Sequence, residues 1–374
     1  MTGQNHKDNY KALTFNVLFV NQFDLFMNNS AGITVRDMFG DEYCRNMPKL
    51  FIDGDKSIFE QRNLKEELSF DIQNWRHLAS FLKKTNPDIV YTTASSSKVL
   101  LFLLYIKIKL NIPVLMHFFD NWREIGSVHR KNSILKLLGW PHERALVISD
   151  EMKTYYRKKY HGNYTTLMVG TATGNNNRQR ESALHEKIEL MYAGGLHLGR
   201  VDALSDIEKV IVEQFSDVQL VIATFSDGEG YNKHHTRFDE SRTKFLIDVQ
   251  HEEMDAYYSK ADALIFVESA PNDKLNYLRY SMSTKIPEYL SSGLPIICYA
   301  KPGIACYEYF KRTGSALLAS TPEEVAHAIE KVRTGDCDEI VARACEAAKR
   351  DFDRGVQRDI LNSVIKEMTC KSGI

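Results

Sequence analysis

The sequence has no marked excess of charge of one sign. It contains 48 lysine and arginine residues against 49 aspartate and glutamate residues in a chain of 374 residues. Proteins dedicated to binding nucleic acid show a strong basic excess. The near balance of charge therefore argues against nucleic acid as a partner.

Paired cysteines and long apolar runs are also missing. The six cysteines are scattered without a CxxC pair, which predicts reduced thiols in a cytoplasmic protein and no zinc site. The first residues, MTGQNHKDNYK, lack the apolar stretch of a signal peptide. The longest apolar run, Val99–Ile106, is too short to span a bilayer. It is either a helix buried against a sheet or a helix at a membrane surface, where Lys107 and Lys109 could meet anionic lipid.

Several motifs of nucleotide and hydrolytic enzymes are absent as well. No GxGxxG follows the first apolar run, and Gly194, Gly195 and Gly199 do not have that spacing. The sequence contains no GxxxxGK[ST] phosphate loop, no HExxH zinc motif and no GxSxG nucleophile elbow. These absences argue against a dinucleotide enzyme, a P-loop nucleotidase, a zinc protease and an α/β-hydrolase.

Four short apolar runs in the first half are rich in β-branched residues. Each is continuous rather than alternating, as expected of parallel strands covered on both faces. Helical patterns lie between them, including Ser95–Leu110 after the second run, so we expect an α/β domain with a doubly wound parallel sheet. The expected strands are Phe15–Asn21, Asp88–Thr92, Pro113–His117 and Ala145–Ser149.

A second series of the same kind follows Gly170–Arg180, a polar and aperiodic stretch typical of a linker. The length suits two domains, and ligands of such sheets bind beyond the carboxyl ends of the strands. The expected strands are Ile188–Tyr192, Val218–Thr224, Phe245–Val249, Ala263–Val267 and Pro295–Tyr299. The expected helices are Ser205–Phe215, Glu252–Lys260, Thr284–Ser292, Pro322–Arg333 and the charged stretch Asp338–Met368.

Four motifs of the second half occur together and in a fixed order. They are Tyr192–Leu196 with Gly199–Arg200 (YAGGL…GR), Ser259–Ser269 (SKADALIFVES), Ser283–Leu290 (STKIPEYL) and Ser292–Ile297 (SGLPII). With them the second half resembles the nucleotide-sugar domain of GT-B glycosyltransferases, in particular family 4, also called glycosyltransferase group 1. The first half matches more loosely, through Ser30–Thr34 (SAGIT), His117, Asp120 and Ile148–Met152 (ISDEM).

The resemblance implies the GT-B fold, in which two Rossmann-like doubly wound domains face a central cleft. Residues 1–175 would bind the acceptor, and residues 186–351 would bind the nucleotide sugar. Members of this fold often end in a helix that crosses back to the first domain. Residues 352–374 are expected to do so here.

Two cations are the candidates for contacting the donor diphosphate. Without a metal, the negative charge that grows on the leaving group must be neutralised by Arg, Lys and helix N-termini. Arg200 and Lys285 could do this. The family usually places an Arg after the glycine corresponding to Gly194, whereas this chain has Gly195 there, and Arg200 falls where the family has a Lys. Either cation could instead be an ordinary surface residue.

Glu288 is the candidate for the ribose, because its family counterpart accepts hydrogen bonds from the two ribose hydroxyls. Retaining members carry a second Glu eight residues earlier, where this chain has Tyr280. Glu268 or Asp273 could occupy the space of that missing acid, and both could be plain loop charges. Thr284, at the start of the same helix, joins the donor-binding candidates. The stereochemical outcome stays open.

The remaining candidates follow other strands. His117 could bond a donor-sugar hydroxyl or be a core histidine, and Asp120 could act beside it or cap a helix. Gly32 would let the backbone approach the ligand closely. The nucleotide base would rest against the backbone of Gln250 and His251.

We therefore expect a cytoplasmic glycosyltransferase that transfers a sugar from a nucleotide diphosphate to a glycan or lipid-linked acceptor. It would act in surface polysaccharide or glycolipid biosynthesis without a cofactor or a catalytic metal, with peripheral contact at the inner face of the membrane as an option. One alternative is a nucleotide-sugar 2-epimerase of the same fold, although no acid/base set beside C2 can be assembled. Another is a non-catalytic partner subunit, which Gly195 and Tyr280 would favour.

Overall fold

The computed structural model divides into two compact units. Unit 1 comprises Met1–Ile148, Lys153–Gly170 and Arg354–Ile374, and unit 2 comprises Ser149–Met152 and Thr171–Asp353. The described residues are 15–21, 25–26, 30–52, 69–71, 75–93, 97–121, 128–138, 144–170, 187–226, 230–250, 253–268 and 278–370. Within these ranges no helix combines the length and the apolar character needed to cross a membrane.

Unit 1 is built on a parallel sheet of seven strands, in the order β3-β2-β1-β4-β5-β6-β7. The central strands are fully buried, which explains why they read as continuous apolar runs. The strand order changes direction at β1: β2 and β3 are added on one side of β1, and β4 to β7 are added on the other side. The strands are β1 (Val17–Asn21), β2 (Lys49–Phe51), β3 (Ser69–Asp71), β4 (Ile89–Thr92), β5 (Val114–Phe118), β6 (Arg144–Val147) and β7 (Asn163–Thr166).

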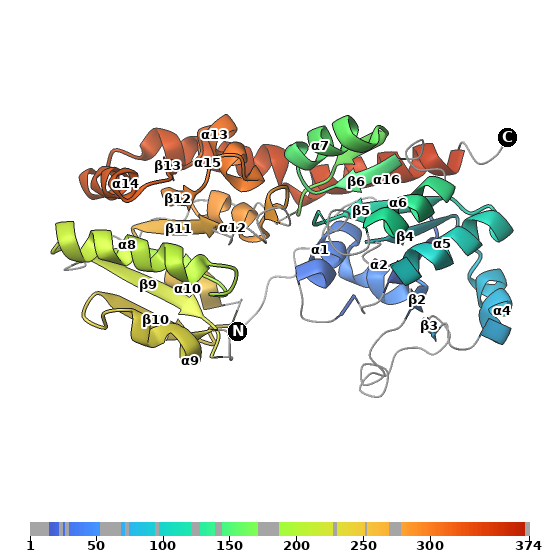
Figure 1. The fold of residues 1–374 in the computed structure, drawn as a ribbon, viewed down its shortest axis with the longest axis horizontal. Helices are drawn as coiled ribbons and strands as arrows, with labels where there is room; N and C mark the ends of the chain where they lie inside the picture. Colours follow the sequence, from blue (N-terminus) through green and yellow to red (C-terminus); the bar gives the residue numbers. More distant parts are fainter. Residues whose placement is uncertain are drawn as a thin grey trace. The chain divides into compact units, whose positions relative to one another are not determined.

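Helices cover this sheet (Figure 1). The helix that ends the described chain, α16, packs on α1 and β4 and contributes Leu361, Val364 and Ile365 to the same core as Phe19. The C-terminal segment therefore belongs to the core of unit 1. The helices of the unit are α1 (Ser30–Phe39), α2 (Asp41–Asn46), α4 (Trp75–Thr85), α5 (Ser97–Leu110), α6 (Val128–Leu137), α16 (Arg354–Cys370) and α7 (Asp150–Tyr160), of which the first three residues belong to unit 2.

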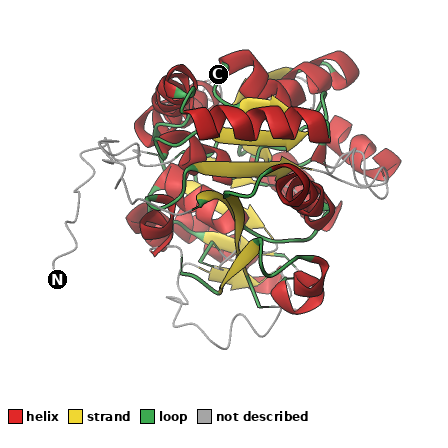
Figure 2. Ribbon diagram, turned by 90° about the vertical axis from the view of Figure 1, so that its left-hand side faces the viewer, coloured by secondary structure: helices red, strands yellow, loops and turns green. Residues whose placement is uncertain are grey.

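Unit 2 repeats the architecture with a six-stranded parallel sheet, in the order β10-β9-β8-β11-β12-β13. The strands lie between layers of helices, as the yellow and red ribbons of Figure 2 show. The strands are β8 (Ile188–Ala193), β9 (Val218–Thr224), β10 (Thr243–Ile247), β11 (Ala263–Glu268), β12 (Ile296–Ala300) and β13 (Leu317–Ala319). The helices are α8 (Arg200–Gln214), α9 (Tyr231–His234), η4 (His235–Arg237), α10 (Met254–Tyr258), α12 (Lys285–Ser291), α13 (Ala305–Thr313), α14 (Pro322–Thr334) and α15 (Asp338–Asp351).

The predicted α/β architecture of two doubly wound sheets is confirmed, and three expected boundaries are corrected. Helix α8 begins at Arg200 instead of Ser205, since Gly199 supplies the left-handed residue (φ 79°) before it. Strand β10 lies two residues earlier than expected. The expected helix Asp338–Met368 is two helices, because Phe352 leaves the helical conformation and buries its ring against Tyr309, with centroids 5.4 Å apart.

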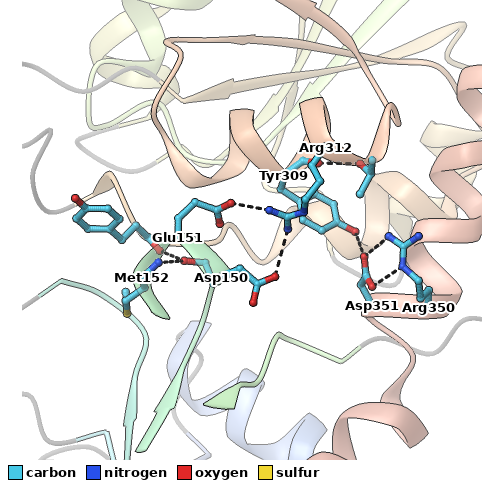
Figure 3. Close-up of polar contacts among 10 residues, drawn as sticks. Asp150, Glu151, Met152, Tyr309, Arg312, Arg350 and Asp351 are labelled. Atoms are coloured by element: carbon cyan, nitrogen blue, oxygen red, sulfur yellow. Dashed lines mark hydrogen bonds and ion pairs between the residues drawn. The ribbon is translucent and has the colours of Figure 1, made fainter. Parts of the chain in front are cut away.

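A polar cluster holds residues 149–152 within unit 2 (Figure 3). The Ser149 hydroxyl donates to the carbonyl oxygen of Tyr280 (2.6 Å) and accepts from the backbone N–H of Met152 (3.0 Å). Arg312 pairs with Glu151 at 2.8 Å and with Asp150 at 3.5 Å. The hydroxyl group and the two carboxylates of the ISDEM motif therefore each have a partner in this cluster.

Candidate functional site

The turn that follows β8 is the centre of the candidate site. Gly194 has a φ of 142°, and its backbone N–H continues the sheet by donating to Ala223 (2.8 Å). The chain then leaves the sheet through Gly195, whose carbonyl oxygen accepts from the Tyr192 hydroxyl at 2.7 Å. The backbone N–H of Ala193 donates to the Tyr289 hydroxyl of α12 at 3.0 Å. The turn is thus fixed from both the strand and the neighbouring helix.

Arg200 lies at the first position of α8 and faces the end of β11. Its guanidinium donates to both carboxylate oxygens of Glu268, at 3.1 and 3.2 Å. The two side chains are 13% and 6% exposed, so the pair is largely removed from water. Burial alone would lower the pKa of Arg200, but the Glu268 carboxylate outweighs it and raises the pKa. Arg200 is therefore a permanent, oriented cation at this edge of the sheet.

Lys285 brings a second cation to the same turn from the first position of α12. Its Nζ lies 3.1 Å from the Tyr192 hydroxyl and 4.5 Å from the centre of the Tyr192 ring. A Cβ placed on Gly194 would lie 1.7 Å from this Nζ, so the ammonium occupies the space that the glycine leaves open. Burial, followed by the nearby Arg200, lowers the pKa of Lys285 to about 7.

The start of α12 carries two further candidates. Thr284 precedes the helix as its cap residue and is exposed, without a side-chain capping bond. Glu288 lies in the first turn and is partly buried. Its charge acts on Lys285 and raises the pKa of that lysine, although burial and Arg200 outweigh the effect. The cations and Glu288 therefore belong to one electrostatic group in unit 2.

Three other donor-site candidates, Gln250, His251 and Asp273, follow strands β10 and β11 in the sequence. Gln250 is exposed after β10, and its side chain donates to the carbonyl oxygen of Asp248 at 3.1 Å. His251 and Asp273 lie outside the described residues. The roles that the sequence predicted for these three residues stay predictions.

The candidates of unit 1 lie on two segments. His117, in β5, is fully buried, and its Nδ1 lies 2.9 Å from the Tyr91 hydroxyl. Burial lowers the pKa of His117 to about 3, so the ring is neutral at neutral pH. Asp120 follows β5 and is partly buried, while Gly32 is buried within the first turn of α1 rather than in a turn before it.

Tyr192 is a site residue that the sequence reasoning did not single out. Its ring lies under Lys285 and its hydroxyl connects Lys285 with the backbone of Gly195. Burial raises the pKa of this phenol, so it acts as a hydrogen-bonding group. The feature of the sequence that could have identified it is a tyrosine two positions before the paired glycines Gly194 and Gly195.

Among the residues that the structure describes, no three His, Cys, Asp or Glu side chains form a group that could hold a metal ion. Metal independence itself stays a prediction. The correspondence of Tyr280 to the second acid of retaining enzymes also stays a prediction, and the structure shows its carbonyl oxygen accepting from the Ser149 hydroxyl.

Part of the second unit matches a known protein family. Residues 187–334 match the family described as glycosyl transferases group 1. No curated protein shows significant sequence similarity to the chain. Among solved structures, a glycosyltransferase from Rickettsia africae ESF-5 is similar, with a TM-score of 0.68, 14% identity, and coverage of 95% of this chain and 98% of that one.

Two further solved structures show the same fold. HepE from Anabaena, in complex with UDP-glucose, gives a TM-score of 0.66 at 14% identity and covers 94% of this chain and 100% of its own. Sucrose-phosphate synthase from Thermosynechococcus elongatus gives a TM-score of 0.65 at 12% identity, and the match covers 95% of this chain and 100% of the synthase chain. The chain therefore has the GT-B fold of these glycosyltransferases, and residues 187–334 of its second unit match the group 1 glycosyl transferase family.

Proposed function

We propose that this protein transfers a glycosyl group from a nucleotide diphosphate sugar to a hydroxyl of a glycan or lipid-linked acceptor. The setting that we propose is surface polysaccharide or glycolipid biosynthesis in the cytoplasm, at the inner face of the membrane. No metal takes part in the proposed reaction. UDP-glucose is the first donor to test, because the similar HepE structure contains it.

The observation that supports the proposal is the convergence of two cations on one turn. Arg200 and Lys285 come from the first positions of α8 and α12; Lys285 lies beside Gly194, and Arg200 is near enough to lower the pKa of Lys285. A diphosphate carries negative charge that grows as the glycosidic bond breaks, and oriented cations in a poorly solvated place stabilise that charge. Glu268 holds Arg200 in its orientation before the donor arrives.

In the proposed reaction an acceptor hydroxyl oxygen forms a bond to the anomeric carbon of the donor. The bond from that carbon to the phosphate oxygen breaks, and the electron pair leaves with the nucleoside diphosphate. Arg200 and Lys285 stabilise the negative charge that develops on the diphosphate. Glu288 holds the ribose by accepting hydrogen bonds at its two carboxylate oxygens. The acceptor proton goes either to the departing phosphate or to a protein base, according to the stereochemical outcome.

Donor cleavage with and without acceptor separates this proposal from its alternatives. A glycosyltransferase releases nucleoside diphosphate faster when a suitable acceptor is present. A 2-epimerase interconverts the sugar without needing an acceptor, and a non-catalytic subunit releases nothing. A thermal-shift series of nucleotide sugars identifies the donor first, because a ligand at about 100 times its Kd adds about 2.7 kcal/mol of stability.

A separate experiment tests whether the transfer reaction needs a metal ion. Transfer is measured after treatment with a chelator and after addition of manganese or magnesium. Unchanged transfer supports the proposal, whereas activity that is lost with the chelator and restored by the metal overturns the metal-independent form of it.

A further inference from the structure

Helix α5 exposes an apolar stripe to solvent. Its other side is buried through Val99, Leu103 and Ile106, among others. Leu101, Tyr105 and Ile108 are spaced by four and three residues, which places them on one side of a helix. They are 44%, 42% and 68% exposed.

Helix α6 extends this surface. Both helices are crossovers between neighbouring parallel strands and contact each other in unit 1 (Figure 1). The Lys107 ammonium donates to the carbonyl oxygen of Leu138, which connects the end of α5 to the end of α6. Ten large apolar side chains are exposed among the described residues, and five of them lie on these two helices. Those five are Leu101, Tyr105, Ile108, Leu110 and Leu137.

The charged residues of α5 and α6 are all basic. Neither helix contains Asp or Glu, although the whole chain has a formal net charge of −1. Lys109, Arg130 and Lys136 are exposed beside the apolar residues. Lys98 is exposed as well, whereas the Lys107 ammonium donates to the carbonyl oxygen of Leu138. The six basic residues of the helices are Lys98, Lys107, Lys109, Arg130, Lys131 and Lys136.

We propose that the α5–α6 surface docks on an anionic lipid bilayer. Apolar side chains enter the acyl boundary while flanking cations meet anionic headgroups, and this combination strengthens peripheral binding. A second copy of the chain is a poorer occupant, because the two cationic surfaces would repel each other. This proposal rests on the membrane location in the proposed function and assigns the surface that makes the contact. Binding at this surface of unit 1 can be measured without donor or acceptor.

The test is sedimentation of the full chain with vesicles. One set contains phosphatidylcholine with about one-third phosphatidylglycerol, and the other contains phosphatidylcholine alone. We expect about tenfold or greater preference for the anionic vesicles at low salt, decreasing as salt screens the charge. Equal partition into both sets, or no partition into either, overturns the proposal.

Two pairs of substitutions locate the surface. Ile108→Ser with Leu137→Ser removes the two most exposed apolar side chains, and Lys109→Glu with Lys136→Glu reverses two exposed charges. Each pair should weaken vesicle binding about tenfold. The matched control, Val212→Ser with Lys349→Glu, changes exposed residues of unit 2 and should bind as the unaltered chain does.

Circular dichroism melting of each variant verifies the fold, and sedimentation equilibrium addresses self-association. Anionic vesicle binding that survives both surface pairs places the contact elsewhere and overturns the proposal. So does a dimer that the Ile108→Ser and Leu137→Ser pair dissociates while vesicle binding stays the same. Donor hydrolysis serves as a separate measurement, so a failure of the membrane proposal is distinguishable from a failure of the proposed reaction.

Discussion

The Nζ of Lys285 lies 3.1 Å from the hydroxyl of Tyr192 and 4.5 Å from the centre of its ring. The ammonium thus rests on an aromatic face beside Gly194, in space that a side chain on that glycine would fill. A cation in this place can contact a phosphate that binds the turn after β8.

The first prediction concerns the protonation of Lys285. Burial lowers its pKa from the ordinary value of 10.5 to about 7. Between those values the unfolded chain holds a proton that the folded chain has released, so this lysine makes the free energy of unfolding rise with pH. The cost of burying the charged form is fully present below pH 7 and disappears as the pH approaches 10.5.

Binding of a nucleoside diphosphate should restore the charge on Lys285. We therefore expect proton uptake on binding at about pH 8, because a nearby diphosphate raises the pKa of the ammonium. Calorimetry in two buffers with different ionisation enthalpies measures the uptake. Lys285→Met should remove it, and proton uptake that persists in this variant would assign it to another group.

The second prediction uses two glycines as a matched pair. Gly194 and Gly293 have positive φ values of 142° and 75°, so alanine at either position adds backbone strain of about 1–3 kcal/mol. An added Cβ would collide with Lys285 Nζ only at Gly194, since nothing lies within 4 Å at Gly293. Gly194→Ala should therefore weaken nucleotide binding more than Gly293→Ala, at similar thermal stability. Equal affinities would show that the position of Lys285 does not matter for binding.

The third prediction separates two roles of Arg200. Arg200→Gln leaves the buried Glu268 carboxylate without its cation, and breaking a buried pair in this way costs about 3–5 kcal/mol. Adding Glu268→Gln removes the unpaired charge and should recover most of the stability. Turnover should stay low in the double variant, because the charge that stabilises the leaving group is still missing. Chemical denaturation and steady-state kinetics on both variants make the comparison, and recovered turnover would assign Arg200 a structural role only.

The fourth prediction concerns Glu288. Glu288→Gln keeps the shape of the side chain but loses its charge and replaces one acceptor with a donor. Hydrogen bonds to charged groups contribute about 1.5–3 kcal/mol, so affinity for the nucleoside diphosphate should fall roughly ten- to a hundredfold. The helix should persist, since only a small dipole contribution is lost in its first turn. Unchanged affinity in calorimetry would remove Glu288 from the ribose site.

The sequence by itself determined the two α/β sheets and most strands of the second half. Val218–Thr224 was predicted with the bounds that the structure shows, because a continuous apolar run between polar turns fits only a strand buried on both faces. The three-residue strands β2, β3 and β13, of which β3 and β13 lie at sheet edges, were not predicted. Three residues give too little periodicity, and their strand conformation depends on the neighbour that they pair with.

The sequence also supplied the candidates Arg200, Lys285 and Glu288, since charged residues after strands and at helix starts can be found from motif spacing. Only the tertiary structure decided how they combine. It paired Arg200 with Glu268, which lies 68 residues away, and placed Lys285 on Tyr192, 93 residues away. Contacts over such distances arise from strand order and helix packing, which no local pattern encodes, and the buried surroundings that shift the pKa of Lys285 exist only after the sheet has formed.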